Sequence, residues 1–285
     1  MHLLENGKIT KSKSKKLGES NIDLFLDTTI QLERKLSKTQ ELKKLQETFK
    51  EANRVLTSTY VKMEYRRSLV QDWVYIYNVL SEVENFGDLL LRINALTPYS
   101  QRRINRMIGS LAQFFREGIS IITESLGKEL IEISLHYFRL IIEFSMEDFD
   151  DSVSFIINET DCYNAKVSPS LRENKFDNHT VHCKPSDIKC RIIEFFKKNI
   201  DEFKIIYEKL LCLPSLDNEQ ERMKGILEKA LKYPQNMADY RNCWRCADSI
   251  IAVECPQEAI LYTTNEKHFN PICEKIGKRL QTFRY

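Results

Sequence analysis

Three carboxylic acids and one amide stand at places in the chain where an α/β protein often does chemistry. They are Asp27, Glu64, Asp248 and Asn265. Asp27 comes at the polar end of a short apolar run, and Asn265 follows another such run near the other end of the chain. Functional groups of an open parallel sheet gather beyond the carboxyl ends of its strands. We therefore expect the four side chains to meet at one edge of a sheet.

The chemistry expected of such a group is that of a divalent metal ion. Neighbouring carboxylates raise one another's pKa unless a cation neutralises them. A set of oxygen ligands suits Mg²⁺ or Mn²⁺ rather than zinc. An ion held in this way can deprotonate a water and stabilise phosphoryl transfer. The pattern thus predicts a Mg²⁺ or Mn²⁺ site whose ligands are Asp27, Glu64 and Asp248.

The first 80 residues contain the elements that must position two of these groups. Residues 24–30 are predicted to form a short buried strand, and 33–52 have the apolar spacing of an amphipathic helix. Residues 55–58 predict a second strand, after which Ser58 or Thr59 can cap a helix. A helix connecting two such strands implies that they are parallel.

The last forty residues return to the same alternation. A helix is predicted to open at 248–254, and 259–263 predict a third strand. A short helix at 275–280 is expected to close the chain.

The middle of the chain has a different pattern. Apolar stripes at helical spacing predict several helices, and 119–144 is apolar on most faces, which predicts a buried helix. Residues 152–160 and 180–184 look extended, and 161–180 are expected to form a polar loop. Residues 1–20 are rich in Lys and Ser and are expected to be a disordered basic tail.

Four segments, in this order, resemble the motifs of PIN-domain nucleases, which include the VapC-like ribonucleases. Leu26-Asp27-Thr28-Thr29-Ile30 is similar to the opening Asp-Thr motif, and Thr57-Ser58 with Glu64 is similar to the second motif. Ala247 to Ala252 resembles the Asp-Ala-x-Ile-Ala motif, and Thr263 to Phe269 resembles the closing segment. The likeness covers under half of the chain.

The resemblance implies a small parallel-sheet PIN-like domain of three layers, α/β/α, with a large mainly helical insertion. The domain would comprise 21–80 plus 232–285, and 81–231 would be the insertion, with a possible short hairpin. Asn265 departs from the Asp that many members carry there, which removes one charge. Three carboxylates still suffice for one ion.

The same resemblance implies a metal-dependent endoribonuclease. Water would attack the phosphodiester and leave a 5′-phosphate and a 3′-hydroxyl. Carried over by position, Asp27, Glu64 and Asp248 would bind the metal, and Asn265 would contact a metal-bound water or substrate. Thr28 and Ser58 would donate hydrogen bonds that hold the carboxylates.

Basic side chains offer candidate contacts to RNA phosphates. An ordinary solvated face is the alternative for each of them, and for His268 an ordinary capping role is the favoured one. The candidates are Arg66, Arg67, Arg102, Arg103, Arg106 and His268.

The cysteines suggest a second metal site with less weight. Cys162, His182, Cys183 and Cys190 could bind a structural zinc ion that joins the extended segments of the insertion. Small buried hydrophobes are the more ordinary role of such cysteines. Eight cysteines in 285 residues are too few for a disulfide scaffold.

Composition leaves the broad class open and excludes a few alternatives. The chain has 43 Lys and Arg against 41 Asp and Glu, a net charge of +2, so nucleic acid is neither required nor forbidden. No stretch has the roughly 18 uncharged apolar residues of a membrane span, and 1–20 lacks the apolar core of a signal peptide. We expect a cytoplasmic protein without a membrane partner.

The expected function is RNA cleavage, in the manner of a toxin or a stress or antiphage effector, with an inhibitory antitoxin-like protein as one partner and a homodimer as one assembly. A non-catalytic PIN-like scaffold that binds RNA or protein is the main alternative. A structure-specific DNA nuclease is the second, ranked lower because such enzymes usually carry more acidic residues.

Overall fold

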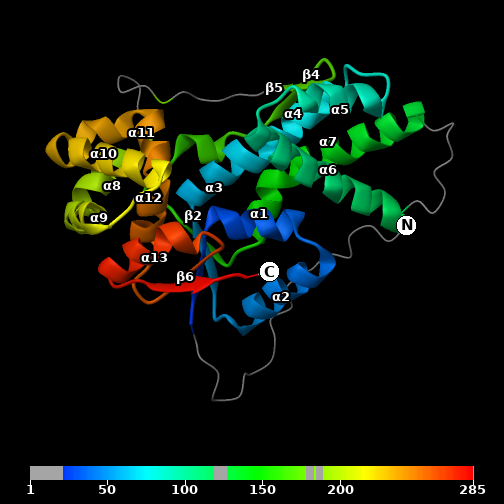
Figure 1. The fold of residues 1–285 in the computed structure, drawn as a ribbon. Coiled ribbons are helices and arrows are strands. Elements are labelled where there is room, and N and C mark those ends of the chain that lie inside the picture. The colour runs from blue at the N-terminus through cyan, green and yellow to red at the C-terminus, as the bar shows by residue number, and fades with distance from the viewer. Residues whose placement is uncertain (1–21, 119–126, 178–182, 184–188, 285) are drawn as a thin grey trace.

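The computed structural model describes residues 22–118, 127–177, 183 and 189–284. The expected basic tail at 1–20 lies outside these residues. Helices surround a sheet of five parallel strands in the order β3-β2-β1-β6-β7 (Figure 1). The strands are β1 (Leu24–Leu26), β2 (Val55–Ser58), β3 (Phe155–Ile157), β6 (Ile260–Thr263) and β7 (Arg279–Thr282). The predicted α/β class with a parallel sheet is confirmed.

Register places the two ends of the chain side by side in the sheet. Leu26 of β1 is paired with Tyr262 of β6, and Phe25 of β1 is paired with Leu56 of β2 on its other side. Because all three strands run the same way, Asp27 and Thr263 leave the sheet at the same edge. This edge is the one expected to carry the functional groups.

The two faces of the sheet belong to different hydrophobic clusters. Phe25 packs into the large core that includes the helices after β2, whereas Leu24 and Leu26 pack with Leu45 and Phe283 in a smaller cluster. Alternate side chains of a strand point to opposite faces, so both faces of β1 are covered. Central parallel strands are typically buried in this way.

The first helices differ from the expected boundaries. β1 ends at Leu26 rather than continuing to residue 30, because Asp27 accepts a hydrogen bond from the backbone N–H of Thr28 and caps α1 (Thr28–Leu36). The single helix predicted over 33–52 is two helices, α1 and α2 (Thr39–Glu51), which are separated by extended residues at Ser37 and Lys38. β2 lies where the sequence predicted it.

Helical structure runs from the end of β2 to residue 80 with one irregular turn. α3 (Thr59–Tyr65) passes into a π-helical turn, η1 (Arg66–Val70), and then into α4 (Gln71–Leu80). π-Helical turns inside α-helices occur frequently at functional sites. This one begins two residues after Glu64.

The middle of the chain is mainly helical, as predicted, but it also supplies β3, which pairs with β2 at the edge of the sheet. A short hairpin does occur, at β4 (Ser170–Arg172) and β5 (Lys175–Asp177), inside the expected polar loop. Its two turn residues, Glu173 and Asn174, both have positive φ, as the common two-residue hairpin turn requires. Most of 180–184 lies outside the described residues.

The helices between α4 and α12 are α5 (Phe86–Asn94), α6 (Pro98–Gly118), α7 (Gly127–Asp151), η2 (Tyr163–Lys166), α8 (Ile192–Lys198), α9 (Ile200–Cys212), α10 (Asn218–Lys232), η3 (Pro234–Ala238) and α11 (Tyr240–Arg245).

Two predictions about helices are corrected. Of the buried helix predicted over 119–144, residues 119–126 lie outside the described residues, and the rest belongs to α7, which is not buried on most faces because Ile133, Leu140 and Phe144 are exposed on it. The closing helix expected at 275–280 is instead the end of α13 (Glu266–Lys275) followed by β7. Gly277, at a φ of 70°, makes the turn between them. The helix that carries Asp248, α12 (Ala247–Glu254), is as predicted.

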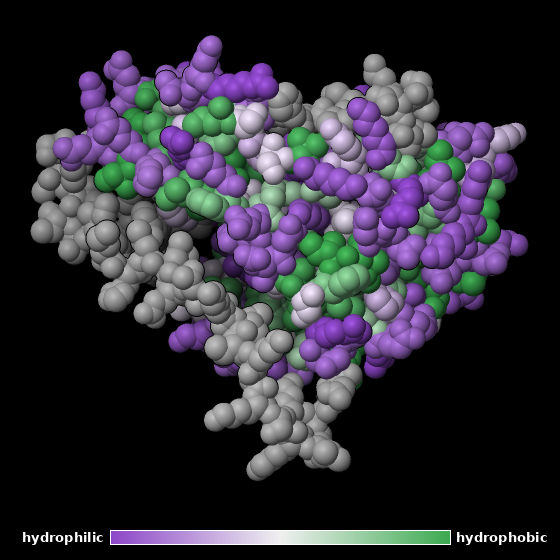
Figure 2. Space-filling model, turned by 180° about the vertical axis from the view of Figure 1, so that it is seen from behind, coloured by the Kyte–Doolittle hydropathy of each residue, from purple (hydrophilic) through white to green (hydrophobic). Residues whose placement is uncertain are grey.

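The surface seen from behind is largely hydrophilic, with hydrophobic side chains gathered near its middle (Figure 2). Within the described part of the chain, no helix is both long and apolar enough to cross a membrane.

Candidate functional site

Asp27 occupies the junction of β1 and α1 and is buried, with 3% of its surface exposed. Its Oδ1 accepts from the Thr28 backbone N–H at 2.5 Å, and its Oδ2 accepts from the hydroxyls of Thr29 at 2.8 Å and Thr263 at 2.7 Å. Burial, and then the charge of Asp248, raise the pKa of Asp27 to about 6 against the opposing effect of the hydrogen bonds. A fully buried carboxylate is thus held in one orientation.

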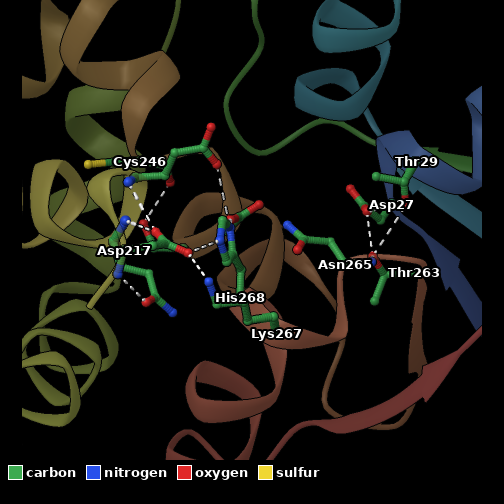
Figure 3. Close-up of polar contacts among 12 residues, drawn as sticks. Asp27, Thr29, Asp217, Cys246, Thr263, Asn265, Lys267 and His268 are labelled. Atoms are coloured by element: carbon green, nitrogen blue, oxygen red, sulfur yellow. Dashed lines mark hydrogen bonds and ion pairs between the residues drawn. The ribbon is translucent and has the colours of Figure 1, made fainter. Parts of the chain in front are cut away.

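The same threonines join two turns that are more than 230 residues apart in sequence. The Thr29 hydroxyl accepts from the backbone N–H of Thr264 at 3.0 Å, and the Thr263 hydroxyl accepts from that of Asn265 at 2.9 Å. Figure 3 shows Thr29 and Thr263 on either side of the Asp27 carboxylate. The turn after β1 and the turn after β6 are therefore locked together around this carboxylate.

Glu64, in the last turn of α3, is held from α1. Its Oε2 accepts from the hydroxyl of Thr28 at 2.6 Å, while among the described residues its Oε1 accepts no hydrogen bond. Burial is the main cause that raises the pKa of Glu64 to about 8, and the charges of Asp27 and Asp248 add to it. Although the charge of Arg67 opposes this increase, Glu64 is mostly protonated at neutral pH when no metal ion is bound.

Asp248 lies in the first turn of α12 and is bound by a histidine. His268 Nδ1 is 2.9 Å from Asp248 Oδ2, and His268 Nε2 is 2.9 Å from Asp217 Oδ2. These contacts, led by the hydrogen bond to Asp248, raise the pKa of His268 to about 9, so the ring is a cation that donates to both carboxylates. Lys267 also donates to Asp217, at 2.7 Å (Figure 3).

Asn265 stands between these two groups. Figure 3 places its side chain between His268 on one side and the pair of Asp27 and Thr263 on the other. It occupies the N-cap position of α13, yet its side chain makes no capping hydrogen bond. The amide is therefore free for a contact other than the cap.

The structure brings the predicted acids into one electrostatic group, since Asp248 raises the pKa of both Asp27 and Glu64. Among the described residues, however, no three His, Cys, Asp or Glu side chains are arranged to coordinate a single ion directly. An ion shared by the three carboxylates would require side chains to rotate, or waters to bridge the remaining distance.

Of the two hydroxyls expected to hold the carboxylates of the site, Thr28 holds Glu64, and Ser58 contacts none of them. Ser58 accepts from the backbone N–H of Val61 at 3.2 Å and so caps α3. Its neighbour among the acids is Glu254, whose pKa it lowers, not Glu64. The side chains that the sequence reasoning missed are Thr29, Thr263 and Asp217. Thr29 and Thr263 lie inside the quoted motifs, whereas the signal at Asp217 is only that of a helix cap.

Most of the basic side chains expected to contact RNA have partners within the protein. Arg66 is 2% exposed and donates to the carbonyl of Val167, so it is a buried structural residue and not a surface contact. Arg103 binds Asp72 and Arg106 binds Glu33. From the sequence, His268 is expected to contact RNA or to act as an ordinary cap. The structure instead buries it between two carboxylates.

Arg102 and Arg67 differ from these. Arg102 is exposed and donates to the carbonyl of Pro98 within its own helix. Arg67 lies over the ring of Trp244, with its Cζ 5.0 Å from the ring centroid. Its charge lowers the pKa of Glu64, which places it beside the acidic group.

The cysteines expected to bind zinc are only partly described, because His182 lies outside the described residues. The thiols of Cys183 and Cys190 lie near enough to Cys162 to raise its pKa, which burial mainly raises to about 12. All eight cysteines of the chain are free thiols. The structural zinc ion remains a prediction.

No protein-family model, no curated protein and no solved structure matches this chain.

Proposed function

We propose that this protein is a metal-dependent nuclease that hydrolyses RNA phosphodiesters with a Mg²⁺ or Mn²⁺ ion held by Asp27, Glu64 and Asp248. The observation that carries the proposal is that these acids come from three separate elements and form one group at the carboxyl edge of a parallel sheet, where the charge of Asp248 raises the pKa of both Asp27 and Glu64. A group of like charges is unfavourable unless a cation neutralises it. The resemblance of four ordered segments to PIN-domain motifs supports the same conclusion.

The donor set fits such an ion. All three ligands are carboxylates, which Mg²⁺ and Mn²⁺ prefer. Glu64 Oε1 accepts no hydrogen bond among the described residues, and neither does Asp248 Oδ1. When bound, the ion would lower the pKa of a water and stabilise the negative charge that develops on the phosphate.

The residues of the chain would divide the remaining work. Thr29 and Thr263 fix the orientation of Asp27, and Thr28 fixes that of Glu64. Asn265 offers an amide to a water or to a phosphate oxygen. His268 holds Asp248 while it carries a positive charge of its own near the anionic substrate.

Cleavage of RNA by matched variants tests the proposal. Purified wild type with Mn²⁺ should cleave total RNA, and EDTA should stop the reaction. Asp27→Asn or Asp248→Asn should lower the rate at least about 100-fold, as removal of a main electrostatic contact at a reaction centre does. Asp23→Asn is the control, because Asp23 lies at the amino end of β1 and binds Arg54.

Sequencing of the new 5′ ends would identify the cut sites, and single-stranded DNA should be cleaved more slowly than RNA. If Asp27→Asn and Asp248→Asn cleave as fast as Asp23→Asn, the catalytic assignment is wrong. RNA binding without any metal-dependent cleavage would instead favour a non-catalytic scaffold.

A further inference from the structure

Trp244 on α11 is a large aromatic side chain that the hydrophobic core does not use. Its exposed fraction is 53%, whereas Trp73, the second of the two tryptophans in the chain, is buried with 3% exposed. Buried aromatic rings contribute strongly to stability. A tryptophan that is half exposed therefore needs another explanation.

The surroundings of Trp244 connect it to the acidic group. Arg67 places its guanidinium carbon 5.0 Å from the centroid of the Trp244 ring, within the range of a cation–π contact. The hydroxyl of Tyr60 donates to the carbonyl of Cys243 at 2.8 Å, which ties α11 to α3, the helix that carries Glu64. The exposed Trp244 and the partly exposed Arg67 thus form one pair at the side of the carboxylates.

Two further basic residues lie on the helix that carries Trp244. Arg241 and Arg245, on the same short helix, are both exposed. The charge of Arg67 also reaches the acidic group, where it lowers the pKa of Glu64. A polyanion that approached the carboxylates would meet these basic and aromatic side chains on α11 and η1.

Aromatic rings beside cations are the elements from which single-stranded nucleic acids are bound. Each unpaired base can stack on an aromatic face, while Arg pairs with the phosphate or stacks on the base. Bases inside a duplex already stack on one another, so they cannot use such a surface. The pair therefore selects a single strand over a duplex and depends little on sequence.

We propose that Trp244 and Arg67 form a stacking site for an unpaired RNA base, which holds the adjoining phosphodiester next to Glu64 and Asp248. This inference rests on the proposed function for the identity of the polymer, although base stacking itself requires no metal and no cleavage. Arg67 is one of the RNA contacts that the sequence predicts, and the proposal retains that role. Trp244 is a residue that the sequence reasoning did not single out.

The experiment uses the protein's own fluorescence, since Trp244 is the exposed one of its two tryptophans. In EDTA, where the RNA stays intact, addition of a 12-residue oligouridylate should quench the emission of the wild-type protein. An RNA duplex of the same length should quench it much less. Trp244→Phe should abolish the quenching, because the remaining Trp73 is buried. The same variant should keep most of the affinity, as measured by anisotropy of a labelled strand, because Phe retains an aromatic face.

Trp244→Leu removes the stacking face and should weaken binding of the single strand about 5- to 150-fold, the effect expected for one stacked base. Phe155→Leu is the matched control, since Phe155 is an exposed aromatic side chain at the amino end of β3. It should bind as the wild type does. Arg67→Lys, which keeps the charge and loses the planar group, should weaken binding less than Arg67→Met.

The outcomes separate this inference from the proposed function. Quenching and a Trp244→Leu effect without metal-dependent cleavage would support the stacking site and contradict the nuclease. Cleavage with no quenching would contradict the stacking site alone. So would a Trp244→Leu variant that loses as much affinity for the duplex as for the single strand. Equal quenching by oligothymidylate would overturn RNA as the polymer that the site selects. Binding of the single strand that is unchanged in Trp244→Leu would contradict the stacking site.

Discussion

Burial makes the ionisation of Asp27 and Glu64 costly, and the protein offsets that cost differently at each residue. Asp27 accepts three hydrogen bonds and its pKa is about 6, whereas Glu64 accepts one and its pKa is about 8. Hydrogen bonds to a carboxylate favour its charged form. Of the two acids, Glu64 is therefore the one that depends more on a cation to ionise.

Glu254 is a buried acid outside the candidate site, and it allows a prediction about pH. It is 5% exposed, and burial raises its pKa to about 7, against the hydroxyls of Ser58 and Thr160. The folded state thus binds this proton more tightly than the unfolded state, in which the pKa of the Glu254 carboxyl is near 4.5. The resulting stability is complete below pH 4.5 and is lost as the pH rises through 7.

Glu254→Gln should remove that loss. The variant should match the wild type near pH 5 and exceed its free energy of unfolding by up to about 3 kcal/mol at pH 8.5, as measured by chemical denaturation at both values. Glu258→Gln, at an exposed position, is the control and should follow the wild type. If the stability difference between the variant and the wild type is the same at pH 8.5 as at pH 5, burial does not raise the pKa of Glu254.

At the scale of elements, helix ends position the candidate site. Asp27 caps α1, Asp248 lies in the first turn of α12, and Asn265 is at the N-cap of α13. The N-terminus of a helix carries partial positive charge, which favours acids there. The carboxyl edge of the sheet is therefore built from helix starts and the turns that lead into them.

Asp217 links the middle of the chain to this edge in the same way. It caps α10 in a capping box with Gln220 and also accepts from His268 and Lys267. Although burial raises the pKa of Asp217, the backbone N–H of Gln220 and the two cations lower it well below its usual range. Helix α10 and α13 are thereby joined through one carboxylate.

Two substitutions at Asp217 should separate its role as a helix cap from its role as an ion-pair partner of His268 and Lys267. Asp217→Ala loses both the cap and the cations and should lower the free energy of unfolding by about 1–2 kcal/mol. Asp217→Asn keeps an oxygen for the cap and should retain most of that stability while it weakens the hold on His268. Thermal and urea unfolding of both variants would measure this, and equal losses in the two would mean that the ion pairs, not the cap, dominate.

At the scale of the molecule, the candidate site exists only because the two ends of the chain share a sheet. β1 lies between β2 and β6, and the acids come from α1, α3 and α12. A ligand that binds all of them binds the folded chain and not the unfolded one. Such a ligand stabilises the whole fold.

Mn²⁺ should therefore raise the melting temperature. At pH 8 and about 100 times its dissociation constant, an ion adds about 2.7 kcal/mol, or on the order of 5 °C for a protein of this size. The increase should be smaller at pH 6, where the ion must displace protons from Glu64 and Asp27, whose pKa values are about 8 and about 6. Differential scanning fluorimetry should show the increase in wild type and Asp23→Asn, and little of it in Asp27→Asn. An equal increase in all three would place the ion elsewhere.

The sequence by itself determined the features that short segments encode. The apolar runs before Asp27 and Asn265 and at residues 55–58 specify buried strands, and helical periodicity specifies α12 around Asp248. These signals are local because burial of one strand or one helix face depends on its own side-chain pattern. The parallel sheet and the shared edge of Asp27, Glu64 and Asp248 followed from them.

The tertiary structure alone decided how distant segments meet. The pairing of β3 with β2 and the hold of His268 on Asp217 and Asp248 join segments that are separate along the chain. Hydrogen bonds and burial of this kind depend on the packing of the whole core, and no spacing in the sequence specifies it. For the same reason, the contact of Arg67 on η1 with Trp244 on α11 is visible only in the tertiary structure.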